Sequence, residues 1–244
     1  MTAETLMLLT LGVLVIAFLY SSVGHAGASG YIAIMSLAGL APASIKPTAL
    51  ALNILVASIG SFQFWRAGHF SWPLFWPFAL LSVPLAYMGG YLTLPAHVFH
   101  MLVGVVLLYS AARFFARPPA EIEPSRPPVP VAVGVGGAIG LLSGLTGTGG
   151  GIFLTPVMLL MHWARTKPTA ATSSLFILVN SISGLLGNVT STGQFPAFAF
   201  ALLAAAGIGG AVGSYYGSRR FAPVVIKRLL AVVLLIAGSK LLFG

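Results

Sequence analysis

The sequence predicts an all-α polytopic membrane protein, and three observations lead to this fold class. Of the 244 residues, 58% are hydrophobic and only 6% are charged, whereas soluble domains carry roughly a quarter charged residues. The apolar residues form continuous runs of about 20, the length that a helix needs to cross a bilayer. These runs lack the period-two alternation of a transmembrane β-barrel, and the chain is far too apolar to be disordered.

Ten apolar segments follow one another along the chain. They cover approximately residues 5–23, 31–41, 47–65, 72–92, 97–115, 130–146, 151–162, 168–190, 196–217 and 223–243. Eight of them are long enough to cross about 30 Å of hydrocarbon. Segments 31–41 and 151–162 are shorter, and at about 1.5 Å per residue each covers about half a bilayer. Because each follows a glycine-rich stretch, we expect two short broken or re-entrant elements beside about eight full spans.

The positive charges predict the orientation of the chain. Of the twelve Lys and Arg residues, ten fall in the odd-numbered connections between segments, and only Lys46 and Lys240 fall on the other side. Cytoplasmic loops are enriched in Lys and Arg, so the odd connections are expected in the cytoplasm and both termini outside. The membrane is then expected to be a bacterial cytoplasmic membrane.

An internal repeat divides the chain into two halves. Three motifs recur in the same order at a nearly constant offset. They pair residues 24–30 with 144–150, 46–49 with 167–170, and 54–59 with 177–182. An odd number of segments in each half would insert the second half upside down. We therefore expect a first inverted repeat at 1–116, a proline-rich cytoplasmic linker at 117–130 and a second inverted repeat at 131–244. In such transporters the substrate site forms where broken helices of the two halves meet.

The sequence resembles the sulfite exporter TauE/SafE family of membrane permeases. The resemblance covers essentially the whole chain, and four stretches carry it: Gly144–Pro156, Phe176–Gly187, Lys46–Asn53 and Phe64–Phe70. It implies a membrane transporter that exports sulfite, a sulfonate such as sulfoacetate, or another small organic anion.

The glycine-rich stretch of the second half is the first candidate substrate site. Backbone N–H groups at the start of a short helix attract anions without any charged side chain, and threonine hydroxyls add donors. The candidate contacts are Thr146, Gly147, Thr148, Gly149, Gly150 and Gly151. Close helix packing is the alternative role of glycine, and we expect it for the regularly spaced glycines at 136–144 and 209–217.

Further candidates lie in the first glycine-rich stretch and within the long spans. They are His25, Ser29, Gly30, Asn53, Ser174 and Asn180. His25 is a candidate proton relay or anion ligand, and a hydrogen-bonded structural histidine is the alternative. Polar side chains inside a bilayer are costly unless they have partners, so the two asparagines line a cavity or join helices.

Lys46 and Lys167 occupy equivalent positions in the two halves. Each precedes a proline that suits the first turn of a helix, where a cation is electrostatically unfavourable. Keeping the lysine twice suggests that each gathers anions at one vestibule, a gating or electrostatic role. Ordinary snorkelling to the membrane interface is the alternative.

Together these features predict a secondary transporter of small anions. The chain has no Asp, and its three glutamates lie at the N-terminus and in the linker, whereas proton and cation pumps commonly place carboxylates inside the membrane. Without Cys, and with only scattered His, we expect no metal and no cofactor. The isolated basic residues do not form a nucleic-acid surface. The expected partners are the anion and the lipid bilayer.

Three other classes remain as alternatives. An anion channel of similar architecture and a non-transporting subunit of a membrane complex are both compatible with the sequence. An intramembrane hydrolase would use Ser143, Ser173 or Ser181 with His25 as base, but the chain lacks a Gly-x-Ser-x-Gly elbow and an Asp to orient the histidine. The identity of the anion, the coupling, the direction and the oligomeric state stay open.

Overall fold

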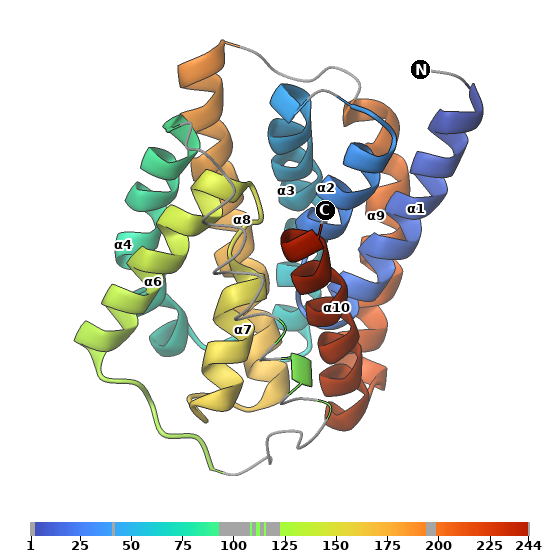
Figure 1. The fold of residues 1–244 in the computed structure, drawn as a ribbon. Helices are drawn as coiled ribbons and strands as arrows, with labels where there is room; N and C mark the ends of the chain where they lie inside the picture. Colours follow the sequence, from blue (N-terminus) through green and yellow to red (C-terminus); the bar gives the residue numbers. More distant parts are fainter. Residues whose placement is uncertain are drawn as a thin grey trace.

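The computed structural model describes residues 3–40, 42–92, 123–193 and 199–243, together with Leu108, Ala111, Ala112 and Phe115. Within these ranges all regular secondary structure is helical, without a strand (Figure 1). The helices are α1 (Ala3–Ser22), α2 (Ala28–Leu37), α3 (Pro42–Arg66), α4 (Trp72–Tyr91), α6 (Val129–Thr146), α7 (Gly151–Leu160), α8 (Thr166–Thr192), α9 (Ala199–Tyr215), the π-helical turn η1 (Tyr216–Arg220) and α10 (Pro223–Phe243). The all-α prediction is confirmed, while most of segment 97–115 lies outside the described residues.

Five of the described helices are long and apolar enough to cross a membrane. These are α1, α3, α4, α6 and α8. The two segments that the sequence marked as short are helices of 10 residues each, α2 and α7. The chain is therefore a multi-pass membrane protein, and the total of eight full spans stays a prediction.

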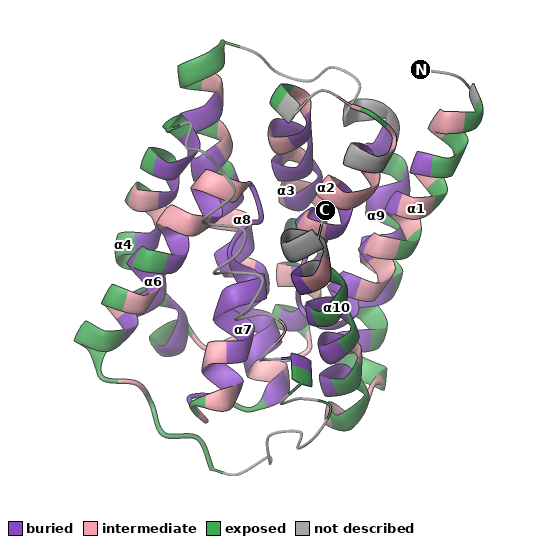
Figure 2. Cartoon of the chain, viewed as in Figure 1, coloured by how far each residue is buried: buried purple, intermediate pink, exposed green. Residues whose placement is uncertain are grey.

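Helices α3 and α8 lie in the middle of the packing and contact each other along their length. On one side α8 also contacts α4, and α4 packs against α6; on the other side α3 contacts α9, and α9 packs against α1. Large apolar side chains such as Leu8, Leu80 and Ile208 are exposed on the outer helices, and the green outer faces of Figure 2 show this distribution. Such faces are suited to lipid.

Two stripes of glycine allow the outer helix pairs to approach closely. A Cβ atom on any of these glycines would overlap the backbone of the neighbouring helix. Gly136, Gly140 and Gly144 of α6 lie against the carbonyls of Phe78, Ser82 and Ala86 in α4, and Gly209, Gly213 and Gly217 lie against those of Leu14, Phe18 and Ser22 in α1. Both runs are therefore packing stripes, as the sequence predicted.

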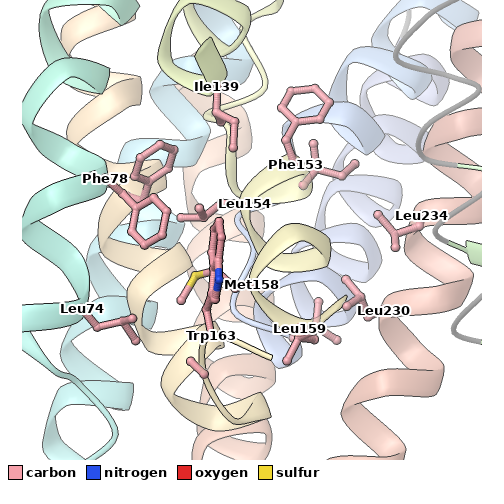
Figure 3. Close-up of a cluster of buried hydrophobic side chains, with 14 of the residues drawn as sticks. Leu74, Phe78, Ile139, Phe153, Leu154, Met158, Leu159, Trp163, Leu230 and Leu234 are labelled. Carbon is pink, nitrogen blue, oxygen red and sulfur yellow. The ribbon is translucent and has the colours of Figure 1, made fainter. Parts of the chain in front are cut away.

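The short helix α7 is held by an apolar cluster contributed by several helices. Leu154 and Met158 of α7 are fully buried. In Figure 3 they lie near Phe78 of α4 and Trp163, with Leu230 of α10 on the other side. This packing fixes the place of the N-terminus of α7.

The start of α3 corrects the sequence prediction. The helix begins at Pro42 rather than near residue 47, so Pro47 lies inside the helix and Lys46 is in its second turn. The reason is that Pro42 takes the first-turn position that proline favours. In the second half α8 begins at Thr166, and Pro168 lies in the first turn as predicted.

Candidate functional site

Two irregular stretches interrupt the helical packing. The first break, residues 23–27, joins α1 to α2, and the second break, residues 147–150, joins α6 to α7. Gly24 and Gly27 in the first break have φ angles of 82° and 109°, and Gly147, Gly149 and Gly150 in the second have 76°, 78° and 84°. Only glycine adopts such angles without a steric penalty, which explains why both breaks are rich in glycine.

Helices α3 and α8 close tightly over the second break. The amide Nδ2 of Asn53 in α3 donates to the carbonyl of Thr148 at 3.3 Å and approaches Oγ of Ser181 in α8 at 3.4 Å. A Cβ atom on Gly149 would lie 2.8 Å from that amide nitrogen and 3.0 Å from the Ser181 hydroxyl. The absence of a side chain at Gly149 therefore leaves these two polar groups facing bare backbone.

The first break is held by α7 and α8. Nε2 of His25 lies 2.8 Å from the hydroxyl of Thr155 in α7, and that hydroxyl lies 2.7 Å from Oγ of Ser173 in α8. The neighbouring Ser174 donates to the carbonyl of Gly24 at 3.1 Å and to that of Ala170 in its own helix at 2.9 Å.

Asn53 and Ser174 form an equivalent pair. Each is the seventh residue after the lysine of its Lys-Pro-Thr-Ala motif, Lys46 or Lys167. Each donates a hydrogen bond to a backbone carbonyl in the break of the opposite half. The two breaks are thus anchored reciprocally.

Several polar atoms at the breaks are buried without a partner. They are Nδ1 of His25, Oδ1 of Asn53 and Oγ of Ser143; Nδ2 of Asn180 in α8 is also buried without a partner. Buried polar groups in proteins are normally paired, so these atoms are available to a ligand. The Oδ1 atom of Asn180 accepts a hydrogen bond from Ser82 in α4 at 2.8 Å.

The remaining residues of the second break have structural contacts. The Thr146 hydroxyl donates to the carbonyl of Leu142 at 2.7 Å and lies 2.9 Å from the hydroxyl of Thr148. Gly147 ends α6, whereas Gly150 is the N-cap of α7 and Gly151 is its first residue. The backbone of Gly150 and Gly151 therefore presents the N-terminus of α7.

Ser29 and Gly30 face a different neighbour. The Ser29 hydroxyl lies 2.9 Å from the hydroxyl of Tyr20 in α1, and a Cβ atom on Gly30 would meet Ile16 of the same helix at 2.6 Å. The structure thus brings His25 and Asn53 together with residues of the second half, and Ser174 of the second half together with Gly24 of the first. Ser29 and Gly30 instead join α2 to α1.

The two lysines have different surroundings. Nζ of Lys46 donates to the carbonyls of Gly90 at 3.2 Å and Gly89 at 3.4 Å, in the last turn of α4. A cation at a helix C-terminus is favourable, so Lys46 stabilises the end of α4, a contact that the sequence did not indicate. Lys167 lies in the first turn of α8.

Near Lys167, the loop residue His69 has an altered pKa. Burial lowers the pKa of His69, and the charge of Lys167 lowers it further. The hydrogen bond to the carbonyl of Ser218, at 3.0 Å, acts in the opposite direction.

Sequence reasoning missed Ser82 as a site residue and considered Ser181 only as a nucleophile. Ser82 is fully buried, and its position as a polar residue within an otherwise apolar stretch of α4 could have marked it as a site residue. His25 hydrogen-bonds to Thr155 rather than to Ser143, Ser173 or Ser181, which does not match the serine–histidine pair of a hydrolase.

A multi-pass helical protein with two glycine breaks at a buried polar site has the build of a membrane transporter. Comparison with known proteins gives the same class. Over 240 residues the chain is 42% identical to the "Probable membrane transporter protein y4hK" of Sinorhizobium fredii, covering 96% of this chain and 97% of that protein. Over 113 residues it is 29% identical to the "Probable membrane transporter protein YunE" of Bacillus subtilis, covering 46% and 41%.

The family model described as "Sulfite exporter TauE/SafE" matches residues 8–241. The chain belongs to this family of transporters, as the sequence resemblance predicted. No solved structure matches it.

Proposed function

We propose that the protein exports small sulfur-containing or organic anions, such as sulfite or a sulfonate like sulfoacetate, across the bacterial cytoplasmic membrane. One observation carries the proposal: buried polar atoms without a partner occur at both glycine breaks, on His25 in the first break and on Asn53 and Ser143 beside the second. The three acids of the chain lie elsewhere, Glu4 near the N-terminus and two glutamates in the linker. A neutral site of backbone and amide donors suits an anion better than a cation.

The inverted-repeat organisation is part of the proposal, and the helix contacts support it. If α1 corresponds to α6, α3 to α8 and α4 to α9, then the contact of α1 with α9 corresponds to that of α6 with α4. The contact of α3 with α9 likewise corresponds to that of α8 with α4. Both pairs of matched contacts occur, and the α1–α9 and α4–α6 contacts each contain a glycine stripe. Under this arrangement repeats 1–116 and 131–244 flank the linker.

The donors of the second break suit the binding of an oxyanion. A Cβ atom at positions 149–151 would overlap the side chains of Ile177, Asn53 or Phe176, so the N-terminus of α7 is in close contact with α3 and α8. Its backbone N–H groups are the donors that we propose for the oxyanion. The hydroxyls of Ser143, which lies beside Gly150, and of Thr148 in the second break supply further donors close to this helix end. Hydrogen bonds to a charged acceptor are the stronger kind.

Export of such an anion needs no coupling ion. A monovalent anion that leaves a negative cell interior gains about 2.3 kcal/mol per 100 mV. At 1.4 kcal/mol per factor of ten this supports a concentration ratio of roughly fifty. The absence of carboxylates from the spans agrees with uniport.

Flux measurements on purified protein in liposomes test the proposal. Vesicles loaded with sulfite or sulfoacetate should release the anion faster when valinomycin and a potassium gradient make the interior negative, and the rate should saturate with anion concentration. Ligand-induced thermal stabilisation with sulfite, sulfoacetate, thiosulfate and sulfate ranks the substrates. The absence of flux for every anion, with folded protein in the bilayer, would contradict transport by this chain.

Two other outcomes separate the remaining alternatives. Flux that follows a pH gradient and ignores voltage would replace uniport with electroneutral movement of anion and proton. Non-saturating flux with unitary conductance would identify an anion channel.

A further inference from the structure

We propose that the starts of α4 and α6 form a binding site for an anionic phospholipid, with Arg126 at the headgroup and an aromatic face of α4 along an acyl chain. The site is separate from the glycine breaks and does not depend on the proposed anion export. It lies on the side of the molecule that the distribution of Lys and Arg predicts to be cytoplasmic.

Helices α4 and α6 are parallel and begin at the same level. They lie side by side in Figure 1. Their register follows from three glycines of α6, which lie in ascending order against residues of α4: Gly136 against Phe78, Gly140 against Ser82 and Gly144 against Ala86. Extended back towards the N-termini, this register places the start of α6 beside the start of α4.

A hollow of about 400 Å³ lies at these two helix starts. It is lined by Pro73, Leu74, Trp76, Pro77, Arg126, Pro127, Pro128 and Val129. Arg126 is the charged member of this lining, which contains no carboxylate, and its side chain is exposed. A guanidinium binds phosphate oxygens through parallel N–H groups, so the hollow suits the phosphate of a lipid.

The last residues of the linker are held at the hollow. The backbone N–H of Ser125 donates to the carbonyl of His162, just beyond α7, at 3.1 Å. On the other side of Arg126, Pro127 and Pro128 have a φ angle that the proline ring fixes. Arg126 is therefore flanked by an anchored residue and a stiff segment, which reduces the conformational entropy that binding would cost.

The two helix starts add to the positive potential of Arg126. Neither α4 nor α6 has a side-chain hydrogen bond at its N-cap. The N-terminus of a helix carries a partial positive charge, and here two such ends lie together beside the guanidinium. A net negative headgroup fits this potential. A zwitterionic headgroup would add an ammonium group, for which the lining has no carboxylate.

An apolar groove of about 470 Å³ adjoins the hollow along α4. It is lined by Trp72, Phe75, Trp76, Ala79 and Leu80, a spacing that places these residues on one face of the helix. Trp76 also lines the hollow, so the two spaces are continuous. Trp72 and Leu80 are each 60% exposed. Tryptophan is typical of the membrane–water interface, so this groove suits the upper part of an acyl chain.

Quenching of tryptophan fluorescence by brominated lipids tests the site. Trp65→Phe serves as the parent protein, because it removes a tryptophan that is 62% exposed and outside the groove, while Trp163 is buried. Trp72 and Trp76 are then the reporters that lipid can reach. In phosphatidylcholine vesicles, brominated phosphatidylglycerol should reach half-maximal quenching at a mole fraction about fivefold lower than brominated phosphatidylcholine, the effect of one cation near the membrane surface. Arg126→Gln should remove this preference.

Arg219→Gln is the matched control. Arg219 is also exposed, and its Cζ atom lies 5.3 Å from the ring centroid of Tyr215. It belongs to η1 and lines neither the hollow nor the groove, so its substitution should leave the preference intact. Equal quenching by the two lipids in the parent protein would overturn the inference. An equal loss in both arginine variants would also overturn it, because it would show attraction to surface charge in general.

Two further measurements exclude other occupants. Glycerol phosphate, which has the phosphate without acyl chains, should not reduce the quenching by brominated phosphatidylglycerol. A reduction would indicate a site for free phosphate and refute the lipid site. A dimer in native mass spectra, with Trp72 and Trp76 shielded from both lipids, would assign this face to a second copy of the chain and refute it as well. None of these readouts uses sulfite flux, so the lipid site and the proposed export succeed or fail separately.

Discussion

Gly149 combines the two reasons for which a position requires glycine. Its φ angle is 78°, and a Cβ atom would press against the amide of Asn53 and the hydroxyl of Ser181. We predict that Gly149→Ala reduces sulfite flux at least tenfold while the protein still folds, because the methyl group would displace the Asn53 and Ser181 groups that hold the second break. Flux per folded molecule in liposomes measures the effect.

Gly193 provides the matched control for Gly149. It has a similar φ angle of 65°, and no atom lies within 4 Å of its Cβ position. Both alanine variants bear the backbone strain of about 1–2 kcal/mol, so only the loss of space distinguishes them. Gly193→Ala should retain normal flux. Normal flux in Gly149→Ala as well would reduce the second break to a packing element.

The two lysines should differ in their effect on stability. Lys46 donates to the last carbonyls of α4, so Lys46→Gln should lower the free energy of unfolding by about 0.3–1 kcal/mol. Lys167 lies in the first turn of α8, where a cation is unfavourable, so Lys167→Gln should leave stability unchanged or raise it slightly. Thermal unfolding in detergent measures both, and equal losses would contradict the assigned contacts.

The same lysine variants test the vestibule role. If each lysine gathers anions, both substitutions should weaken sulfite binding by about 1 kcal/mol or less, with a smaller effect at high salt. An affinity that is independent of both lysines would leave them with structural roles alone.

Among the helices, α6 depends most clearly on close approach. Gly140 lies against the backbone and side chain of Ser82 in α4, whereas Gly134 of the same helix faces open space. We predict that Gly140→Val lowers the free energy of unfolding by about 2 kcal/mol or more through overpacking. Gly134→Val should have a small effect. Because Ser82 also orients Asn180, Gly140→Val should weaken anion binding too. A Gly140→Val protein with unchanged stability would contradict the close packing of α6 on α4.

Local sequence signals predicted most helices but not every boundary. Apolar length and flanking glycine located α2 and α7, since a helix boundary is set by neighbours in sequence. Pro42 and Pro47 both suit the first turn of a helix, and in the structure α3 begins at Pro42. The π-helical turn Tyr216–Arg220 has no signature in hydropathy, because its polar end, Ser218 to Arg220, is typical of a connection between apolar segments.

The candidate site was predictable in its parts and not in its pairings. Glycine-rich stretches and buried amides drew attention to Asn53 and Asn180. Their partners Thr148 and Ser82 lie about a hundred residues away in sequence. Such contacts depend on the tertiary arrangement, which neither composition nor periodicity contains.

The whole molecule has a predicted orientation that the absence of native cysteine makes easy to test. Ser125 of the linker and Glu4 at the start of α1 are both exposed, and in Figure 1 the start of α1 and the segment that leads into α6 lie at opposite ends of the molecule. In intact cells an impermeant thiol reagent should label Glu4→Cys and not Ser125→Cys, because the distribution of Lys and Arg predicts a cytoplasmic linker. The reverse pattern would invert the topology and the expected direction of the anion gradient.

The reciprocal anchoring of the breaks has a consequence for how the protein is made. The first half of the chain is synthesised before α7 and α8. At that stage the carbonyl of Gly24 lacks its partner Ser174, and the ring of His25 lacks its partner Thr155. The second break in turn needs Asn53, which is already in the membrane. The site can therefore be completed only when α8 packs against α3, and a chain that stalls at the linker lacks the completed candidate site.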